Sequence, residues 1–191
     1  MIDDNKILFE DCPVKILQDP QEFAELIKIY TQRKPENVLE VGSFFGGTLY
    51  YWIKNNKNLK NLTSIDSPIP PSDHRYEEMM ESRDKWKEWT NGDSFTFHDL
   101  RGRSEDAEIL LKAGRSVYDF IFIDGGHEFQ TVLNDFIRFF PMLRIGGIIA
   151  FHDIHYITDV GKAWERIKNW GFPSKEIINK DGGFGIGIIY K

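Results

Sequence analysis

The sequence predicts an α/β fold in which a single doubly wound sheet is mostly parallel and ends in a C-terminal antiparallel hairpin. Strand-like and helix-like segments alternate through most of the 191 residues, an order typical of parallel sheets with right-handed crossovers. Residues 118–124 include four consecutive apolar side chains, as expected for a strand covered on both faces. Two short apolar runs near the end of the chain flank turn-forming residues 179–183, and this pattern predicts the hairpin.

The first helix is expected to begin after Asp19, which can cap it, with Pro20 at its first position. A proline-rich loop over 67–72 follows the second strand and is expected to form one wall of a pocket. In order, the expected elements are a helix over 20–33, a strand over 38–41, a helix over 48–53, a strand over 62–66, a helix over 73–89, a strand over 94–98, a helix ending near 113, a strand over 118–124, a helix over 127–140, a strand over 147–151, a helix over 160–170, and hairpin strands over 176–178 and 184–190.

Length and composition predict one domain, with a cap segment and helix over residues 1–34 and a core over 35–191. The net charge of -6 argues against a nucleic acid or an anionic membrane as partner. The first eleven residues carry five charges and no apolar run approaches ~18 residues, so no signal peptide or membrane span is expected. The single cysteine, Cys12, cannot form an intrachain disulfide. We therefore expect a cytoplasmic protein, whose oligomeric state is left open, a homodimer included.

Polar residues or glycines follow each of the five expected parallel strands. They are Gly42, Asp66, the segment 98–104, Asp124 and the pair 152–153. Because ligands of open α/β sheets bind outside the carboxyl ends of the strands, these positions are expected to border one crevice.

The first of these strand ends opens into a glycine-rich turn, residues 42–47, that leads into a helix. Such a turn lets the backbone approach a ligand closely and points free N–H groups at it, although a purely structural turn has the same pattern. Phe44 stands where the dinucleotide fingerprint has its second glycine, so a nucleoside with few phosphates fits better than a dinucleotide. Asp66, 24 residues after Gly42, can accept hydrogen bonds from both hydroxyls of a ribose.

Glu40 interrupts the otherwise apolar strand before this turn. An unpartnered buried carboxylate costs several kcal/mol, so it needs a donor. Lys, Arg, a backbone N–H group or a cofactor cation would each serve.

With these motifs in place, the sequence resembles the class I S-adenosylmethionine-dependent methyltransferases, which have a Rossmann-like fold. Residues 38–47 are similar to their first motif, Asp66 to their ribose-binding acid, and residues 102–106 to a loop that contacts adenine in their O-methyltransferases. The resemblance implies these cofactor-binding residues: Gln18, Glu40, Gly42, Ser43, Phe44, Gly47, Thr48, Asp66, Gly102, Ser104 and Asp124.

Within that superfamily, four segments look most like the small-molecule O-methyltransferases grouped with the cephalosporin hydroxylases: residues 15–20, 46–47, 123–127 and 151–153. The resemblance therefore implies methyl transfer from S-adenosylmethionine to a small molecule, at a hydroxyl oxygen. The transferred methyl is already activated, so the protein has to align it and remove the acceptor's proton.

Metal-dependent relatives hold a divalent cation with acidic residues after the fourth and fifth strands, which implies Asp124, His152 and Asp153 as metal ligands here. His152 replaces an acid, and imidazole suits Mn, Fe or Zn better than Mg. His127 is assigned as general base beside Asp124, with His155 as the other candidate in the same region. Structural hydrogen bonding is the alternative role for all of these side chains.

Other readings share some of these features. An NAD-dependent oxidoreductase would share the first strand, turn and ribose acid, but Phe44 and the hairpin count against it. A metal-dependent oxygenase or hydrolase would use the aspartates and His152 without S-adenosylmethionine. A binding module without activity is the third alternative.

Overall fold

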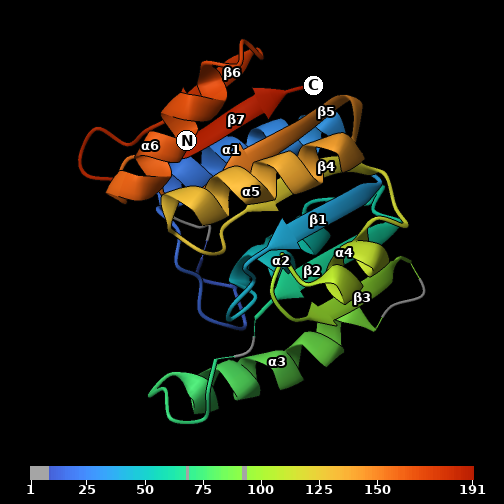
Figure 1. Ribbon diagram of the computed structural model, residues 1–191. Coiled ribbons are helices and arrows are strands. Elements are labelled where there is room, and N and C mark those ends of the chain that lie inside the picture. Colours follow the sequence, from blue (N-terminus) through green and yellow to red (C-terminus); the bar gives the residue numbers. More distant parts are fainter. Residues whose placement is uncertain (1–8, 68, 92–93) are drawn as a thin grey trace, which may run out of the picture.

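The protein is built on one seven-stranded sheet with strand order β3-β2-β1-β4-β5-β7-β6 (Figure 1). This computed structural model describes residues 9–67, 69–91 and 94–191; the start of the expected cap segment and Pro68 of the expected loop lie outside them. Neighbouring strands from β3 to β5 are parallel, whereas β7 is antiparallel to both β5 and β6. The predicted α/β sheet and its C-terminal hairpin are confirmed. The strands are β1 (Asn37–Val41), β2 (Asn61–Asp66), β3 (Thr96–Arg101), β4 (Tyr118–Ile123), β5 (Leu143–Phe151), β6 (Ser174–Ile177) and β7 (Ile186–Tyr190).

Helices cover both faces of the sheet. Buried side chains of α1, α2 and α3 share one apolar cluster with β1 and β4, and those of α4, α5 and α6 share the other. Strand β4 is buried at every position, which explains its run of apolar residues. The helices are α1 (Pro20–Arg33), α2 (Gly47–Lys54), α3 (Tyr76–Thr90), α4 (Ala107–Ala113), α5 (Phe129–Phe139) and α6 (Thr158–Lys168), with a short 3-10 helix η1 (Phe140–Met142) after α5. Among the described residues, none of these helices is long and apolar enough to cross a bilayer.

Several elements differ by two or more residues from their expected bounds, and three of them have a local explanation. Helix α3 begins at Tyr76 instead of residue 73, because the Asp73 carboxylate accepts hydrogen bonds from the backbone and side chain of Arg75 and forms a turn there. Strand β5 begins four residues early at Leu143, and Gly146 accommodates an irregularity in it with φ +82°. Strand β3 lies two residues late, because its register aligns Thr96 with the start of β2.

The start of α1 is tied to the distant hairpin. Asp19 caps the helix as predicted, accepting hydrogen bonds from the N–H groups of Gln21 and Glu22 over 3.0 Å each. Glu22 is buried, and its carboxylate accepts from the N–H groups of Asn179 at 2.7 Å and Gly185 at 2.9 Å. The connection between β6 and β7 is therefore held against the N-terminus of α1.

Candidate active site

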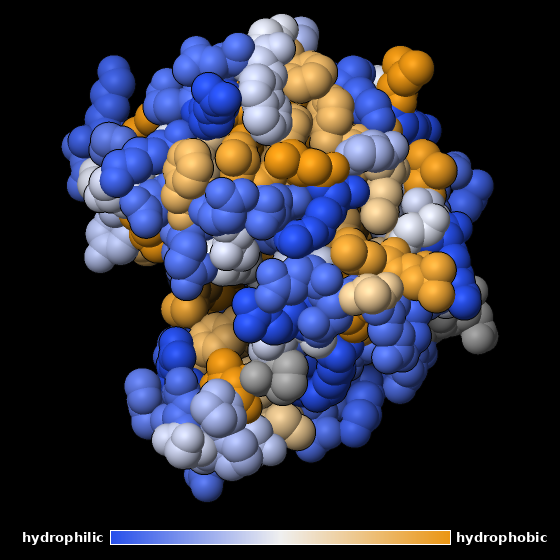
Figure 2. Space-filling model, viewed as in Figure 1, coloured by the Kyte–Doolittle hydropathy of each residue, from blue (hydrophilic) through white to orange (hydrophobic). Residues whose placement is uncertain are grey.

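A cavity of about 710 Å³ lies at the carboxyl ends of the parallel strands, a size typical of small-molecule sites. Figure 2 shows the molecule hollowed at the left of the view, between α3 and the elements above it, on the side toward which β1 points in Figure 1. Residues after all five parallel strands line the cavity, as the sequence predicts, and Ser67 and Ile69 of the proline-rich loop form part of its wall. The predicted site residues that line it are Gln18, Gly42, Ser43, Phe44, Gly47, Thr48, Asp66, Gly102, Ser104, Asp124, His127, His152 and Asp153.

The turn between β1 and α2 requires glycine because the protein itself packs against it. A Cβ on Gly42, whose φ is +89°, would lie 2.0 Å from the carbonyl oxygen of Asp124. At Gly46, with φ +87°, a Cβ would lie 2.1 Å from Nε1 of Trp86 on α3. Packing within the protein thus requires glycine at both positions, and because both also line the cavity, their approach to a ligand stays a prediction. Phe44, also at positive φ, lines the cavity with its ring 5.2 Å from the Arg75 guanidinium carbon.

Glu40 is fully buried beneath this turn and does not line the cavity. Its carboxyl group accepts hydrogen bonds from the Thr48 hydroxyl at 2.8 Å and from the Trp52 indole, and among the described residues no Lys or Arg side chain or backbone N–H group is its partner. Burial raises the pKa of Glu40 to about 8. Glu40 therefore supports the site from below, through Thr48.

One end of the cavity is built around Asp66, at the end of β2. Its buried carboxylate pairs with the Arg83 guanidinium from α3 and faces the N–H groups of Ser43 and Phe44. Burial raises the pKa of Asp66, and Arg83 opposes that shift. Across the same end, the Ser104 hydroxyl donates to Asp135 of α5 over 2.6 Å, which anchors the loop after β3. These residues suit the recognition of a nucleoside.

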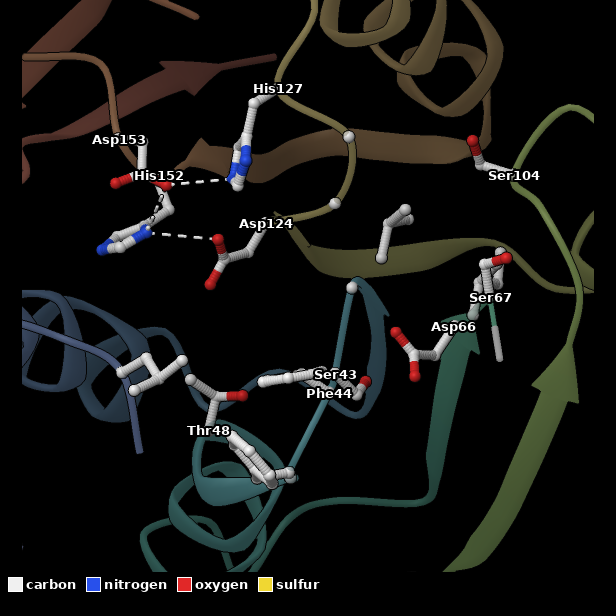
Figure 3. A pocket seen from close by; sticks show the side chains of 18 of the residues that line it. Ser43, Phe44, Thr48, Asp66, Ser67, Ser104, Asp124, His127, His152 and Asp153 are labelled. Carbon is white, nitrogen blue, oxygen red and sulfur yellow. Dashed lines mark hydrogen bonds and ion pairs between the residues drawn. The ribbon is translucent and has the colours of Figure 1, made fainter. Parts of the chain in front are cut away.

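The other end holds two histidines and two aspartates. Figure 3 shows them facing one another, with Asp66 on the opposite side of the cavity. His127 Nε2 lies 3.1 Å from Asp153 Oδ2, and His152 Nδ1 lies 3.3 Å from the same oxygen and 3.2 Å from Asp124 Oδ1. His155, the other candidate base, is not among the lining residues. The Phe184 ring, 5.3 Å from both the His152 and Tyr156 rings, forms an aromatic wall beside the cluster.

The aspartates and histidines of this cluster stabilise one another's charged forms. Burial alone would lower the pKa of His152, but Asp124 and Asp153 outweigh it and raise that pKa to about 10. The hydrogen bond to Asp153 also raises the pKa of His127. Burial would raise the pKa of Asp153, yet the two histidines hold it below its ordinary value. Asp153 is therefore an anion that orients both imidazole rings.

The cluster also fits a divalent cation. Asp124, His152 and Asp153 each offer a ligand atom, and these atoms lie within 4.8 Å of one another. His152 Nε2 is buried and has no hydrogen-bond partner among the described residues. Two carboxylates and an imidazole form a donor set suited to Mn, Fe or Zn.

Gln18, on the segment before α1, completes this end. Its Nε2 donates to Asp124 Oδ2 over 2.8 Å, while its buried Oε1 has no partner among the described residues. Sequence reasoning missed Arg83 and Asp135, which support Asp66 and Ser104 from outside the cavity. Neither position belongs to a motif, and a charged residue on a predicted surface helix gives no signal of burial.

Comparison with known proteins identifies the family to which the chain belongs. Residues 39–154, more than half of the chain, match a family model described as "Methyltransferase domain". The chain belongs to this methyltransferase domain family. The matched region runs from β1 to just beyond β5, so it contains the glycine turn, Asp66 and the polar cluster.

This methyltransferase domain is 32% identical, over 122 residues, to the uncharacterized protein R132 of Acanthamoeba polyphaga mimivirus. The alignment covers 60% of the present chain and 50% of R132, so the chain spans about half the length of that relative.

Solved structures share the fold. One is an O-methyltransferase from Bacillus cereus in complex with SAH (TM-score 0.66, 14% identity, covering 94% of this chain and 84% of that one). Another is TomG from Streptomyces achromogenes, an O-methyltransferase involved in tomaymycin synthesis, in complex with SAM (TM-score 0.64, 16% identity, 92% and 82%). A Staphylococcus aureus protein provisionally named a caffeoyl-CoA O-methyltransferase aligns with TM-score 0.70 and 17% identity over 93% and 86%. At these identities the likeness establishes the Rossmann-like methyltransferase fold alone.

Proposed function

We propose that this domain transfers the methyl group of S-adenosylmethionine to a small molecule, at a hydroxyl oxygen. The observation that carries the proposal is one cavity with a nucleoside-like end at Asp66 and an acid–base cluster at Asp124, His127 and Asp153. S-adenosylmethionine supplies an activated methyl group when bound. Asp66 would accept hydrogen bonds from its ribose hydroxyls, and Gly102 and Ser104 would border its base. Membership of the methyltransferase family supports this choice over an NAD-dependent oxidoreductase.

The cluster of Asp124, His127 and Asp153 would remove the proton of the acceptor's hydroxyl group. His127 is half exposed to the cavity, and its Nε2 is hydrogen-bonded to Asp153, which fixes the ring's orientation. We propose His127 as the general base, in its neutral form, with Asp153 orienting it. Asp124, tied to Gln18 and His152, borders the same space and would help to position the acceptor.

We further propose that Asp124, His152 and Asp153 hold a divalent cation, because their ligand atoms lie within 4.8 Å and His152 Nε2 is buried without a partner among the described residues. A bound cation would supply a Lewis acid that acidifies a hydroxyl group. Asp153 also orients His127 through Oδ2, so one carboxylate would serve both the cation and the base.

Ligand binding tests the cofactor assignment. Calorimetry should detect S-adenosylhomocysteine and no NAD. The Asp66→Ala variant should lose at least ~10-fold in affinity, because each hydrogen bond to a charged group is worth about 1.5–3 kcal/mol. Tight NAD binding without a response to S-adenosylhomocysteine would instead support an oxidoreductase.

A further inference from the structure

Arg83 lies outside the cavity but is in direct contact with its nucleoside end. It belongs to α3 and is 4% exposed, a rare degree of burial for an arginine. Its guanidinium pairs with Asp66 Oδ2 through Nη2 and with Asp99 Oδ1 through Nη1 at 3.4 Å. Its central carbon lies 4.7 Å from the centre of the Trp86 ring. Since Asp66 lines the cavity and Arg83 does not, the guanidinium reaches the carboxylate from the protein side.

We propose that Arg83 is a positioning residue that holds Asp66 in place, as an anion, for the ribose of the cofactor. The inference rests on the proposed function, because it assigns Asp66 to the ribose. Arg83 lies on helix α3, outside the sequence motifs that are similar to those of the methyltransferases.

The environment of Asp66 explains why a cation is needed behind it. The side chain is 8% exposed, and a buried carboxylate without a positive partner takes up a proton. A ribose hydroxyl donates a stronger hydrogen bond to a carboxylate than to a neutral acid. The N–H groups of Ser43 and Phe44 also favour the charged form. Asp99 opposes it, and Asp99 is itself paired with Arg101 at 2.8 Å.

The contacts of helix α3 with the glycine-rich turn fix the position of Arg83. Trp86, one turn further along the helix, donates from Nε1 to the carbonyl oxygen of Phe45 over 2.8 Å and packs where Gly46 has no side chain. Residues three apart lie on the same face of a helix, so Trp86 on the glycine turn brings Arg83 onto Asp66. Helix α3 thus contacts both the glycine-rich turn, through Trp86, and Asp66, through Arg83.

The test is the pH dependence of S-adenosylhomocysteine binding, measured by calorimetry between pH 5 and 8.5. Wild type should lose affinity as the pH falls and Asp66 takes up a proton. In Arg83→Met the midpoint of that loss should move up by about one pH unit or more, which makes the variant at least ~10-fold weaker than wild type at pH values well below both midpoints. Arg83→Lys keeps the charge without the planar fork and should lie between them.

Matched variants separate this role from a structural one. Asp66→Asn should bind weakly with no pH dependence in this range, because it has no carboxyl group at that position. Asp99→Asn removes the other partner of Arg83 and should bind with wild-type affinity above pH 7. If Arg83→Met does not fold, as judged by its thermal transition, the shift in Arg83→Lys carries the test.

The outcomes are distinct. Equal affinity at every pH in wild type and in the folded Arg83 variants, or an equal loss at every pH, would overturn the role of Arg83. If wild type itself does not bind S-adenosylhomocysteine at any pH, the proposed function fails, and this inference fails with it. If Asp66→Asn binds S-adenosylhomocysteine as tightly as wild type does, the assignment of Asp66 to the ribose is wrong.

Discussion

Gln18 Nε2 donates a hydrogen bond to Asp124 Oδ2 over 2.8 Å, which joins two cavity-lining residues 106 positions apart in the sequence. Asp124 in turn accepts from His152 through its other oxygen. One carboxylate is therefore held from both sides, by the segment before α1 and by the end of β5. The orientation of Asp124 depends on both contacts.

Replacing Gln18 should disturb the cofactor site. Gln18→Ala removes the Asp124 partner, and a hydrogen bond to a charged group is worth about 1.5–3 kcal/mol, so the affinity for S-adenosylhomocysteine should fall by roughly 10-fold. Gln18→Glu should be worse, because it sets two carboxylates against each other. Calorimetry measures both. Gln21→Ala, an exposed glutamine on the first turn of α1, is the control and should bind normally.

His127 and His155 give a direct comparison of the two candidate bases. His127→Gln should lower the rate of methyl transfer by about 10²–10⁴-fold, the usual contribution of a general base, and leave S-adenosylhomocysteine binding unchanged. His155→Gln should be as active as wild type, because His155 does not line the cavity. The measurement is single-turnover transfer to an acceptor found by screening hydroxyl compounds. The reverse pattern would transfer the role to His155.

Removal of divalent metal should abolish methyl transfer, with recovery on adding Mn, Fe, Zn or Mg. The direct measurement is Mn²⁺ or Zn²⁺ binding by calorimetry to metal-stripped protein. Asp153→Asn should weaken that binding, since it removes an anionic ligand. Asp159→Asn, an exposed carboxylate on α6, should not. Full activity of the metal-stripped enzyme would leave proton removal to His127 alone.

Glu40 predicts a pH-dependent stability. The folded chain keeps Glu40 protonated up to about pH 8, whereas its ordinary pKa is 4.5, so its contribution is fully present below about pH 4.5 and lost as the pH rises through about 8. Glu40→Gln cannot ionise. The free energy of unfolding of this variant should therefore rise relative to that of wild type between about pH 4.5 and 8, by up to about 1.4 kcal/mol per pH unit.

Urea unfolding at several pH values measures this difference. Glu25→Gln, an exposed glutamate on α1, should run parallel to wild type. Parallel curves for Glu40→Gln as well would show that Glu40 is ionised in the folded protein.

The sequence predicted the positions that follow strands far better than the contacts those positions make. Alternating elements and the apolar run of β4 locate the strand ends, so the residues around Asp66 and Asp124 were found. The partners were not, because a contact such as Arg83 with Asp66 depends on where α3 docks and leaves no periodic pattern.

Two particular residues show the same limit. Glu40 was expected to need a Lys, an Arg, a backbone donor or a cofactor cation, yet Trp52 and Thr48 on the following helix provide its donors. Gly46 was expected in a turn that approaches a ligand, and the Trp86 ring adds a packing requirement for glycine there that the sequence does not indicate. In each case the deciding atom belongs to a side chain whose direction the sequence alone does not give.

The Glu22 carboxylate links the start of α1 to the turn between β6 and β7 across 157 and 163 positions of sequence. That turn carries Phe184, the aromatic wall beside His152. A contact between such distant positions has a high entropic cost of closure, so it is expected to form late in folding and to open first. The amide protons of Asn179 and Gly185 then become probes of a partly opened state, in which the wall beside His152 is lost while the central strands remain protected from hydrogen exchange.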